Sequence, residues 1–374
     1  MVNQNDNANF FLSRVLTKIS NIDIPGFIIS NAPADKTKKA KERLVFLPED
    51  FFVRLENSII SKDKDNGKIK LYSLGKQFGF KLAVLLRLAR TSAGDIDSST
   101  KYIFRFLETL YAKSLKIIEI NLESKLLEIK ASDLAITRKN NFGYIISVGG
   151  CAGIWAYLQN NYDLECVSKK NSNDGTFELF CGPEEIISSK GNILIAENKP
   201  ETNDDLDYLK YNSPPLNYQN SGSFSLAKLV ENKLLSYESG SLLLSKKSRL
   251  LPVEISFLYT LEKELSSVEI FEAAYNCFYD IGTNCNVNDH IVFISQILSG
   301  LGFGTINVVT KENQKIIAFS NYPCITKDLK STNFSLIKGI LYGFIDSKNG
   351  KKNTYSEITF SQTDSSLNLK IVVN

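Results

Sequence analysis

Histidine is almost absent from this chain, which has only His290 among its 374 residues. A mechanism that needs a histidine pair, a histidine-rich metal site or a mixed cysteine and histidine cluster is therefore excluded by count. The sequence also lacks a G-x-S-x-G nucleophile motif and the phosphate-binding motifs G-x-G-x-x-G and G-x-x-x-x-G-K-[ST]. Hydrolase chemistry and nucleotide binding consequently have no support, and no motif identifies a cofactor.

Long apolar runs and cysteine pairs are missing as well. No stretch approaches the ~18 consecutive apolar residues of a membrane span, and the N-terminus has no apolar run behind a basic region. No C-x-x-C pair occurs, and the chain is too large to need disulfide staples, so we expect a cytoplasmic protein in a reducing compartment, without a metal site. The cysteines are Cys151, Cys166, Cys181, Cys277, Cys285 and Cys324.

Charge of one sign does not dominate the chain. Lys and Arg number 44 and Asp and Glu number 41, so the net charge of +3 makes no general case for nucleic acid or an anionic membrane as partner. A basic run from Lys36 to Arg43 lacks interleaved aromatic residues, and we expect a solvated linker there. The paired carboxylates Glu184 and Glu185 are expected to be solvated surface charges, because no apolar frame surrounds them in the sequence.

Two polar stretches divide a chain of otherwise ordinary globular composition, 43% hydrophobic and 23% charged. The first, residues 31–43, holds Pro33 and the basic run, and the second, residues 196–224, is rich in Pro, Asn, Asp and Ser. We therefore expect an N-terminal arm over 1–44, a first domain over 45–195, a polar linker over 196–224 and a second domain over 225–374. Asn288 or Asp289 is expected to cap a helix that starts near His290.

An internal repeat is the strongest signal in the sequence. With an offset of 190 residues and no gap, the stretch from Ser114 to Tyr157 aligns with the stretch from Gly304 to Ser347, and the apolar phase is kept. Two glycines spaced G-x-x-x-G recur in both copies. The aligned pairs include Ile118 with Val308, Leu127 with Ile317, Ile129 with Phe319, Gly149 with Gly339 and Gly153 with Gly343.

The alignment extends beyond this block when small shifts are allowed. It then places Glu165 on Glu357, Phe177 on Leu369 and, upstream, the region of Gly79 on that of Gly282. Each copy has apolar helical stretches, then two strands, the glycine helix and a closing pair of strands. This order predicts an α+β fold of two tandem repeats, each an antiparallel sheet with helices packed on one face.

The order of elements and the glycine motif resemble the 4-vinyl reductase-like domain family, whose fold is shared with the small subunits of TRAPP tethering complexes. The matching residues are Tyr144, Gly149, Gly153 and Glu165 in the first copy and Phe334, Gly339, Gly343 and Glu357 in the second. The resemblance implies a small-molecule-binding or scaffold domain that often dimerises through its helices. The family's cysteine-bearing closing hairpin keeps only Cys181 here.

The glycine helix of the first copy carries the candidate ligand-binding residues Tyr144, Gly149, Gly150, Cys151, Gly153 and Trp155. Small residues at i and i+4 let either another backbone or a flat ligand approach closely. The thiol and the two aromatic rings would suit a hydrophobic or planar molecule, and the alternative is an ordinary buried core. The second copy has Phe334, Leu341 and Ile345 where the first has Tyr144, Cys151 and Trp155, so a ligand is expected in the first copy.

These observations favour a non-enzymatic scaffold, assembly or ligand-sensing protein, whose two copies form an internal pseudo-dimer. The partner would be another protein or a hydrophobic small molecule, and a further homodimer remains open. One alternative is an enzyme or chaperone that acts on a tetrapyrrole-type substrate, as the family name suggests. A second alternative is a nucleic-acid-associated protein that uses the run from Lys36 to Arg43.

Overall fold

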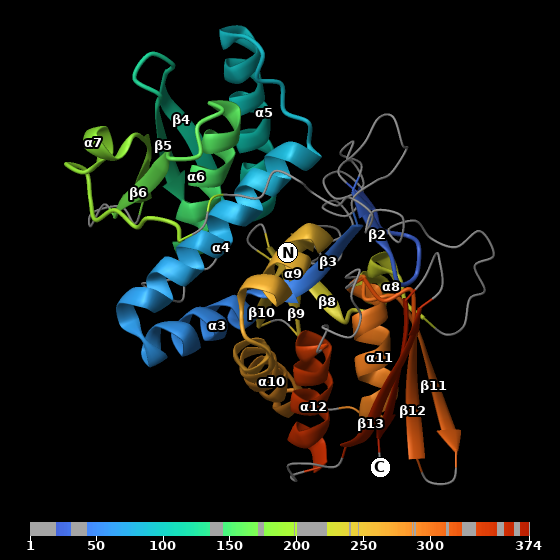
Figure 1. The fold of residues 1–374 in the computed structure, drawn as a ribbon. Coiled ribbons are helices and arrows are strands. Elements are labelled where there is room, and N and C mark those ends of the chain that lie inside the picture. The colour runs from blue at the N-terminus through green and yellow to red at the C-terminus, as the bar shows by residue number, and fades with distance from the viewer. Residues whose placement is uncertain are drawn as a thin grey trace. The chain divides into compact units, whose positions relative to one another are not determined.

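The computed structural model describes residues 20–30, 43–134, 145–170, 176–197, 199, 223–238, 241–245, 247–285, 287, 289–311, 314–323, 334–349, 355–362 and 367–373. Their contacts form two compact units (Figure 1). The middle unit holds residues 52–204, and the terminal unit combines residues 1–51 with 205–374. These units differ in their bounds from the expected domains, 45–195 and 225–374. Residues 43–48 form a strand that pairs within the terminal unit, so this stretch belongs there.

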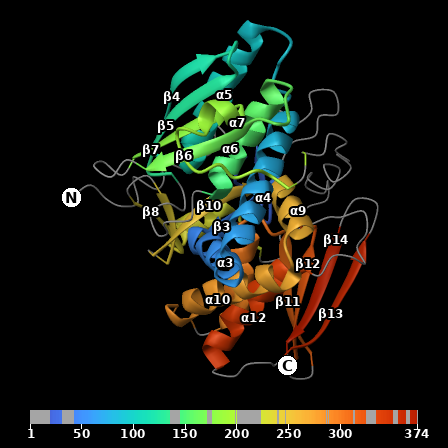
Figure 2. The ribbon, with the colours of Figure 1, turned by 60° about the vertical axis from the view of Figure 1, so that its left-hand side comes forward.

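The middle unit contains one four-stranded antiparallel sheet in the order β4-β5-β7-β6; α5 and α6 pack against one face (Figure 2), and the short α7 packs through Ile187 against Val167 and Phe180 of the other. Leu127, Ile129 and Ala131 alternate with less buried residues along β5, which is the pattern of a strand with one covered face. The elements are α3 (Glu49–Lys62), which enters from the terminal unit, α4 (Lys64–Leu85), α5 (Ala93–Tyr111), β4 (Ser114–Asn121), β5 (Leu126–Ser132), α6 (Ile145–Leu158), β6 (Glu165–Lys170), β7 (Thr176–Gly182) and α7 (Glu184–Ile187).

The terminal unit repeats this series of elements. Its second four-stranded antiparallel sheet has the order β11-β12-β14-β13, which corresponds strand by strand to the sheet of the middle unit. The elements are α9 (Ile255–Glu264), α10 (Ser267–Thr283), α11 (His290–Gly300), β11 (Thr305–Lys311), β12 (Gln314–Ser320), α12 (Ser335–Asn349), β13 (Tyr355–Gln362) and β14 (Leu367–Val373). The α+β fold with two repeats is therefore confirmed, and Asp289 caps α11 by accepting from the backbone of Ile291 and Val292.

A six-stranded sheet in the terminal unit has the order β1-β2-β3-β10-β9-β8. Its two central strands, β3 and β10, pair antiparallel with Phe46 opposite Pro252. Two further strands lie beyond each of them, β2 and β1 on one side and β9 and β8 on the other. Arg43 pairs with Ile29 on one side as Arg249 pairs with Leu243 on the other. The strands are β1 (Ser20–Asn21), β2 (Ile28–Ser30), β3 (Arg43–Pro48), β8 (Leu235–Glu238), β9 (Ser241–Leu244) and β10 (Ser248–Glu254), and α8 (Leu226–Glu231) precedes β8. The duplication thus includes strands from the expected N-terminal arm.

The expectation of a solvated basic run from Lys36 to Arg43 is wrong at Arg43. Its side chain is fully buried, and its guanidinium donates to the carbonyls of Gly26, Gly302 and Asn321 at 2.6–2.8 Å. The group also lies over the ring of Phe27, 4.2 Å from its centroid. Burial lowers the pKa of Arg43 to about 9, so the guanidinium remains charged at neutral pH. Residues 36–42 lie outside the described residues.

Strand pairing tests the repeat alignment residue by residue. Ile129 pairs with Leu179 as Phe319 pairs with Leu369, so Leu369 corresponds to Leu179 and the expected match to Phe177 is wrong by two residues. The match of Glu165 with Glu357 is confirmed, because these residues pair with the equivalent positions Gly182 and Val372.

The gap-free alignment is also wrong at the first strand of the hairpin. Ile120 pairs with Leu127 as Val308 pairs with Ile317, so Val308 corresponds to Ile120 rather than to Ile118. The cause is the longer hairpin of the second copy, whose ladder continues to the pair Lys311–Gln314, whereas the ladder of the first copy ends at the pair Asn121–Leu126. A bulge at Ile118 adds a further irregularity to β4.

Candidate functional site

The G-x-x-x-G motif of α6 lies against the backbone of α4. A Cβ atom added to Gly149 would lie 2.1 Å from the Tyr72 carbonyl oxygen, and one added to Gly153 would lie 2.0 Å from that of Lys76. Gly75 and Gly79 of α4 approach α6 equally closely. Four glycines thus bring two helix backbones into direct contact, which leaves no room for a flat ligand between them.

The other predicted site residues lie around this contact. Gly150 is more open, since an added Cβ would meet only the Gly75 oxygen, at 3.8 Å. Cys151 is buried, and Trp155 is fully buried and donates its Nε1 hydrogen to the Lys125 carbonyl at 2.7 Å. The prediction at Tyr144 falls outside the described residues. Gly149, Gly150, Cys151, Gly153 and Trp155 therefore share one helix whose side chains belong mainly to the core.

The glycine contacts also define which residues of α4 and α10 are equivalent. Gly339 faces the Phe271 oxygen and Gly343 faces the Tyr275 oxygen, as Gly149 faces Tyr72 and Gly153 faces Lys76. Tyr72 therefore corresponds to Phe271, and Lys76 corresponds to Tyr275. The expected match of Gly79 with Gly282 is wrong by one helical turn, because Phe278 occupies the position of Gly79.

A buried polar cluster occupies this face of α4. The Glu165 carboxylate accepts from the Tyr72 hydroxyl and the Lys76 ammonium, each at 2.7 Å, and the Tyr72 oxygen accepts from the Cys166 backbone at 2.8 Å. Burial raises the pKa of Glu165, while Lys76 and Tyr72 act in the opposite direction. Burial and the neighbouring Glu165 raise the pKa of Tyr72, so this tyrosine stays protonated. The cluster ties β6 to α4.

The segment that follows α7 first packs Ile193 against Val167 and Phe180 of the sheet and then reaches the polar cluster of α4 with Ala196, Glu197 and Lys199; Asn198 is not among the described residues. The Glu197 backbone donates to Ser73 Oγ at 3.0 Å, and Gln77 Nε2 donates to the Lys199 carbonyl at 3.2 Å. The backbone of Ala196 acts on Glu165 and lowers its pKa. Lys199 Nζ lies 3.0 Å from Asp163. We call Ala196, Glu197 and Lys199 the covering segment, because they contact the cluster in which Tyr72 and Lys76 are buried.

The equivalent face of α10 carries a stripe of aromatic rings instead. Phe271, Tyr275 and Tyr279 occupy the positions of Tyr72, Lys76 and Phe80, and their rings stack in succession with centroids 5.9 and 6.1 Å apart. Tyr342 of α12 packs edge-on against Phe271. Phe271 and Tyr275 are half-buried, Tyr279 is 36% exposed and the neighbouring Val268 is 56% exposed. We call Val268, Phe271, Tyr275, Tyr279 and Tyr342 the aromatic stripe.

The stripe has its own polar contact. Tyr275 donates its hydroxyl to the buried carboxylate of Asp346 at 2.9 Å, and burial together with this contact raises the pKa of Tyr275 to about 12. Asp346 lies on α12, so the bond joins the two helices that lie side by side in Figure 1. In the first copy an ion pair between Lys76 and Glu165 joins α4 to β6. At the position of Lys76 the second copy has Tyr275, whose neutral hydroxyl donates to Asp346 and joins α10 to α12.

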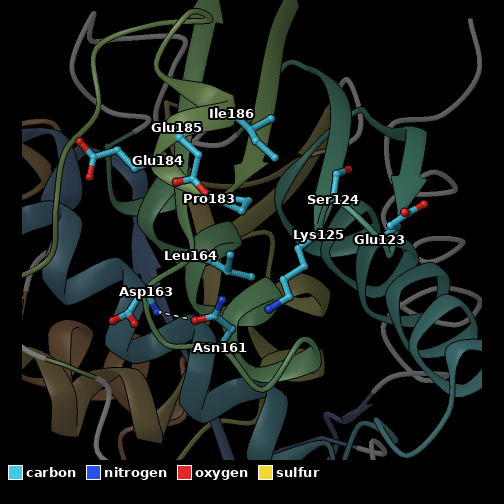
Figure 3. A pocket seen from close by; sticks show the side chains of 10 residues that line it. All are labelled: Glu123, Ser124, Lys125, Asn161, Asp163, Leu164, Pro183, Glu184, Glu185 and Ile186. Atoms are coloured by element: carbon cyan, nitrogen blue, oxygen red, sulfur yellow. Dashed lines mark hydrogen bonds between the residues drawn. The ribbon is translucent and has the colours of Figure 1, made fainter.

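A hollow of about 510 Å³ opens at one end of the first copy's sheet (Figure 3). Lys125 extends toward Asn161 across it, whereas Glu123 points outward (Figure 3). The hollow lies between the β4–β5 turn, the α6–β6 connection and the start of α7, and its lining includes Asp163, Glu184 and Glu185. The predicted ligand residues of α6 are not among those that line it, although Trp155 bonds to the carbonyl of Lys125.

The evenly spaced cysteines of the first copy meet in the fold. Cys166 lies directly opposite Cys181 on the neighbouring strand. Cys151 lies close enough to Cys181 for the second thiol to raise the pKa of the first. Burial raises the pKa of Cys151 and of Cys166, which keeps both as thiols. No group of three or more potential ligands that could hold a metal ion occurs among the described residues.

Reasoning from the sequence did not identify a pair of equivalent glutamates, of which Glu56 is buried and Glu262 is half-buried. Glu56 of α3 is fully buried beside the first turn of α6, where the backbone of Ile146 acts on it, and Glu262 of α9 meets the backbone of Leu336 in α12 in the same way. Burial is the larger effect and raises the pKa of both carboxyl groups. The signal is the dipeptide Leu-Glu, present in both copies at residues 55–56 and 261–262.

Comparisons with protein-family models, with curated proteins and with solved structures gave no significant match. Within the described part of the chain, no helix combines the length and the apolar character that crossing a membrane would need.

Proposed function

We propose that this chain is a non-enzymatic scaffold or assembly protein built from two diverged copies of a 4-vinyl reductase-like domain. One observation carries the proposal: the same helix face is covered in the first copy and presents aromatic rings in the second. Tyr72 and Lys76 are buried beneath the covering segment, whereas Tyr279 and Val268 of the equivalent face are accessible. Exposed aromatic groups of this kind are enriched where proteins bind one another.

The packing of the first copy supports a structural role for its glycine helix. Gly149 and Gly153 contact the α4 backbone, and the Trp155 hydrogen-bond donor is already satisfied. Duplication in one chain makes the copies free to diverge, because each position of the pair mutates separately. The first copy then contributes stability and the second copy contributes the contact surface.

Native mass spectrometry of the chain purified from its own cells tests this function. We expect a protein partner on the wild-type chain, and its loss when Tyr279→Lys places a charge in the aromatic stripe. Tyr102→Lys is the matched control, since Tyr102 is a similarly exposed tyrosine, 47% accessible, on α5 of the first copy. A chain that arrives without a partner, or a partner retained by Tyr279→Lys, would refute the proposal.

A further inference from the structure

Strand β11 forms one edge of the second four-stranded sheet (Figure 1). It pairs with β12 without a bulge, so its backbone groups alternate between the neighbouring strand and the outer side. One contact identifies the outward set: the Ile306 N–H donates to Ser223 Oγ at 2.8 Å, and this hydroxyl donates to the Ile306 carbonyl at 3.2 Å. By the same alternation, the backbone groups of Val308 and Thr310 point outward too.

The outward backbone groups of Val308 and Thr310 are open. Within the described part of the chain, no hydrogen bond engages them on the side away from β12. The side chains here are accessible as well: Val309 is 53% exposed, and Asn307 and Lys311 are exposed. A strand edge with unpaired N–H and carbonyl groups is a template on which another strand can pair.

The corresponding edge of the first copy is protected. The Leu115 N–H at the start of β4 donates to the Glu108 carboxylate at 2.9 Å. A bulge between Ile117 and Glu119 interrupts the ladder, and Glu119 is an exposed charge. Bulges and charged side chains are means by which edge strands avoid pairing. In contrast, β11 has no bulge, and its one charged residue, Lys311, is its last.

Two β11 strands from separate chains are complementary when they run antiparallel about a twofold axis at Val309. Val308 of each chain then exchanges both of its backbone hydrogen bonds with Thr310 of the other, so every open group of one strand meets an open group of the other. Val309 lies opposite its own copy and forms an apolar contact. Asn307 lies opposite Lys311, so no like charges face each other.

The contact of Ile306 with Ser223 selects this register. A twofold axis at Val308 would place Thr310 of one chain opposite Ile306 of the other, whose outward groups Ser223 already holds. With the axis at Val309, the pairing ends before it reaches Ile306. The open part of the edge therefore has the length that a pair of identical strands centred on Val309 requires.

We propose that β11 pairs with β11 of a second copy of this chain, antiparallel about Val309, and joins the two sheets into one. The pairing uses a surface other than the aromatic stripe, so it goes beyond the proposed scaffold function and does not depend on it. Because the paired stretch is short, the dimer is weak and forms as the protein concentration rises.

Sedimentation velocity of the full chain over a range of concentrations measures the association. Val309→Lys places two lysines opposite each other and should weaken dimer formation about tenfold. Ile118→Lys is the matched control, since Ile118 is 55% exposed on β4 of the first copy, and it should leave the dimer unchanged. Tyr279→Lys should also leave the dimer unchanged, which separates this contact from the partner of the aromatic stripe.

Thr310→Pro tests the backbone pairing itself. The Thr310 N–H points away from β12, so proline removes one donor from each copy and leaves the β11–β12 ladder intact. The association should weaken about tenfold through the loss of these hydrogen bonds. Circular dichroism should show the secondary structure of the wild type.

Val309→Cys reports the register without disturbing the backbone. Cysteines that face each other at such a position of an antiparallel pair are within reach of a disulfide. Oxidised glutathione supplies the oxidant: the two thiols lose their protons and two electrons to it, and it leaves as two molecules of reduced glutathione. We expect a disulfide-linked dimer on a non-reducing gel for Val309→Cys, and only the wild-type background for Ile118→Cys.

Three results would overturn the inference. The first is a chain that stays monomeric at every concentration and gives no disulfide-linked dimer from Val309→Cys. The second is a dimer that both Val309→Lys and Thr310→Pro leave intact. The third is a dimer that Tyr279→Lys abolishes and Val309→Lys does not, because the contact would then lie on the aromatic stripe.

Discussion

Glu56 illustrates how one buried residue determines a measurable property of the fold. Its side chain is fully buried at the first turn of α6, and no hydrogen bond of normal geometry satisfies either carboxylate oxygen among the described residues. The Ile146 backbone favours the charged form, but desolvation is the larger effect and raises the pKa well above its ordinary value. Burial therefore favours the protonated form of this carboxyl group in the folded chain.

The stability of the protein should consequently depend on pH through Glu56. An acid with a raised pKa in the folded state binds its proton more tightly there than in the unfolded chain. Its stabilising effect is complete below the unfolded-state pKa and is lost as pH rises toward the folded-state pKa, by up to about 1.4 kcal/mol per pH unit. Urea unfolding of Glu56→Gln should show a free energy of unfolding that falls less than that of the wild type between pH 5 and pH 7.

Glu262→Gln is the matched control for this experiment. Its carboxyl group has the same position in the second copy but is only half-buried, so its effect should be smaller. If Glu56→Gln instead steepens the loss of stability with pH, the carboxylate is charged in the folded state and α6 stabilises it.

At the scale of elements, the contact between α4 and α6 depends on which glycines face the partner helix. Gly149 and Gly153 meet backbone atoms at 2.1 and 2.0 Å from an added Cβ, whereas Gly150 on the same helix is open to 3.8 Å. Backbone atoms cannot move aside as the end of a flexible side chain can. The two helices would have to separate to accept a methyl group at Gly149 or Gly153.

Alanine substitutions should separate these glycines clearly. Gly153→Ala should destabilise the protein by about 2–4 kcal/mol, as expected when a close-packed interface is forced apart. Gly150→Ala should be neutral or stabilising by up to about 1 kcal/mol, because alanine favours the helix. Thermal unfolding of the two variants measures the difference, and equal effects would contradict the direct helix contact.

The elements that could be predicted from sequence are those with strong periodicity. The pairs Leu127 with Ile317 and Gly149 with Gly339 were placed correctly, because apolar alternation and glycine spacing survive in both copies. The expected match of β4 with β11 is wrong because the β11–β12 hairpin is longer than the β4–β5 hairpin, which an ungapped comparison cannot detect. Strands β1 and β2 were missed because elements of two or three residues carry no periodic signal.

The candidate site was less accessible to sequence reasoning. The residues chosen on α6 were singled out by glycine spacing, which the fold uses for helix contact. The cluster of Tyr72, Lys76 and Glu165 joins a helix to a strand 89 residues further along and has no local motif. Ala196 and Glu197 fall within the linker that the sequence predicts, because the backbone bonds that hold them leave no pattern in the sequence.

At the scale of the whole molecule, the chain contains two unequal copies of one unit. The six-stranded sheet has two equivalent halves of three strands each, which meet where Phe46 of β3 pairs with Pro252 of β10. The duplication is therefore still visible in the terminal unit. The helix faces have diverged: α4 buries an ion pair beneath the chain's own segment, and α10 presents aromatic rings. We interpret this divergence as a difference in role: the first copy stabilises the protein, and the second copy binds the partner that we propose.

Photo-crosslinking in the protein's own cells tests this central claim most directly. A benzoylphenylalanine in place of Tyr279 should form crosslinks to one short region of another protein, and the same group in place of Tyr102 should not. Peptide mapping of the crosslinked product identifies the region. Crosslinks from position 279 that map only to this same chain would show that the chain covers its own aromatic stripe and would contradict the account.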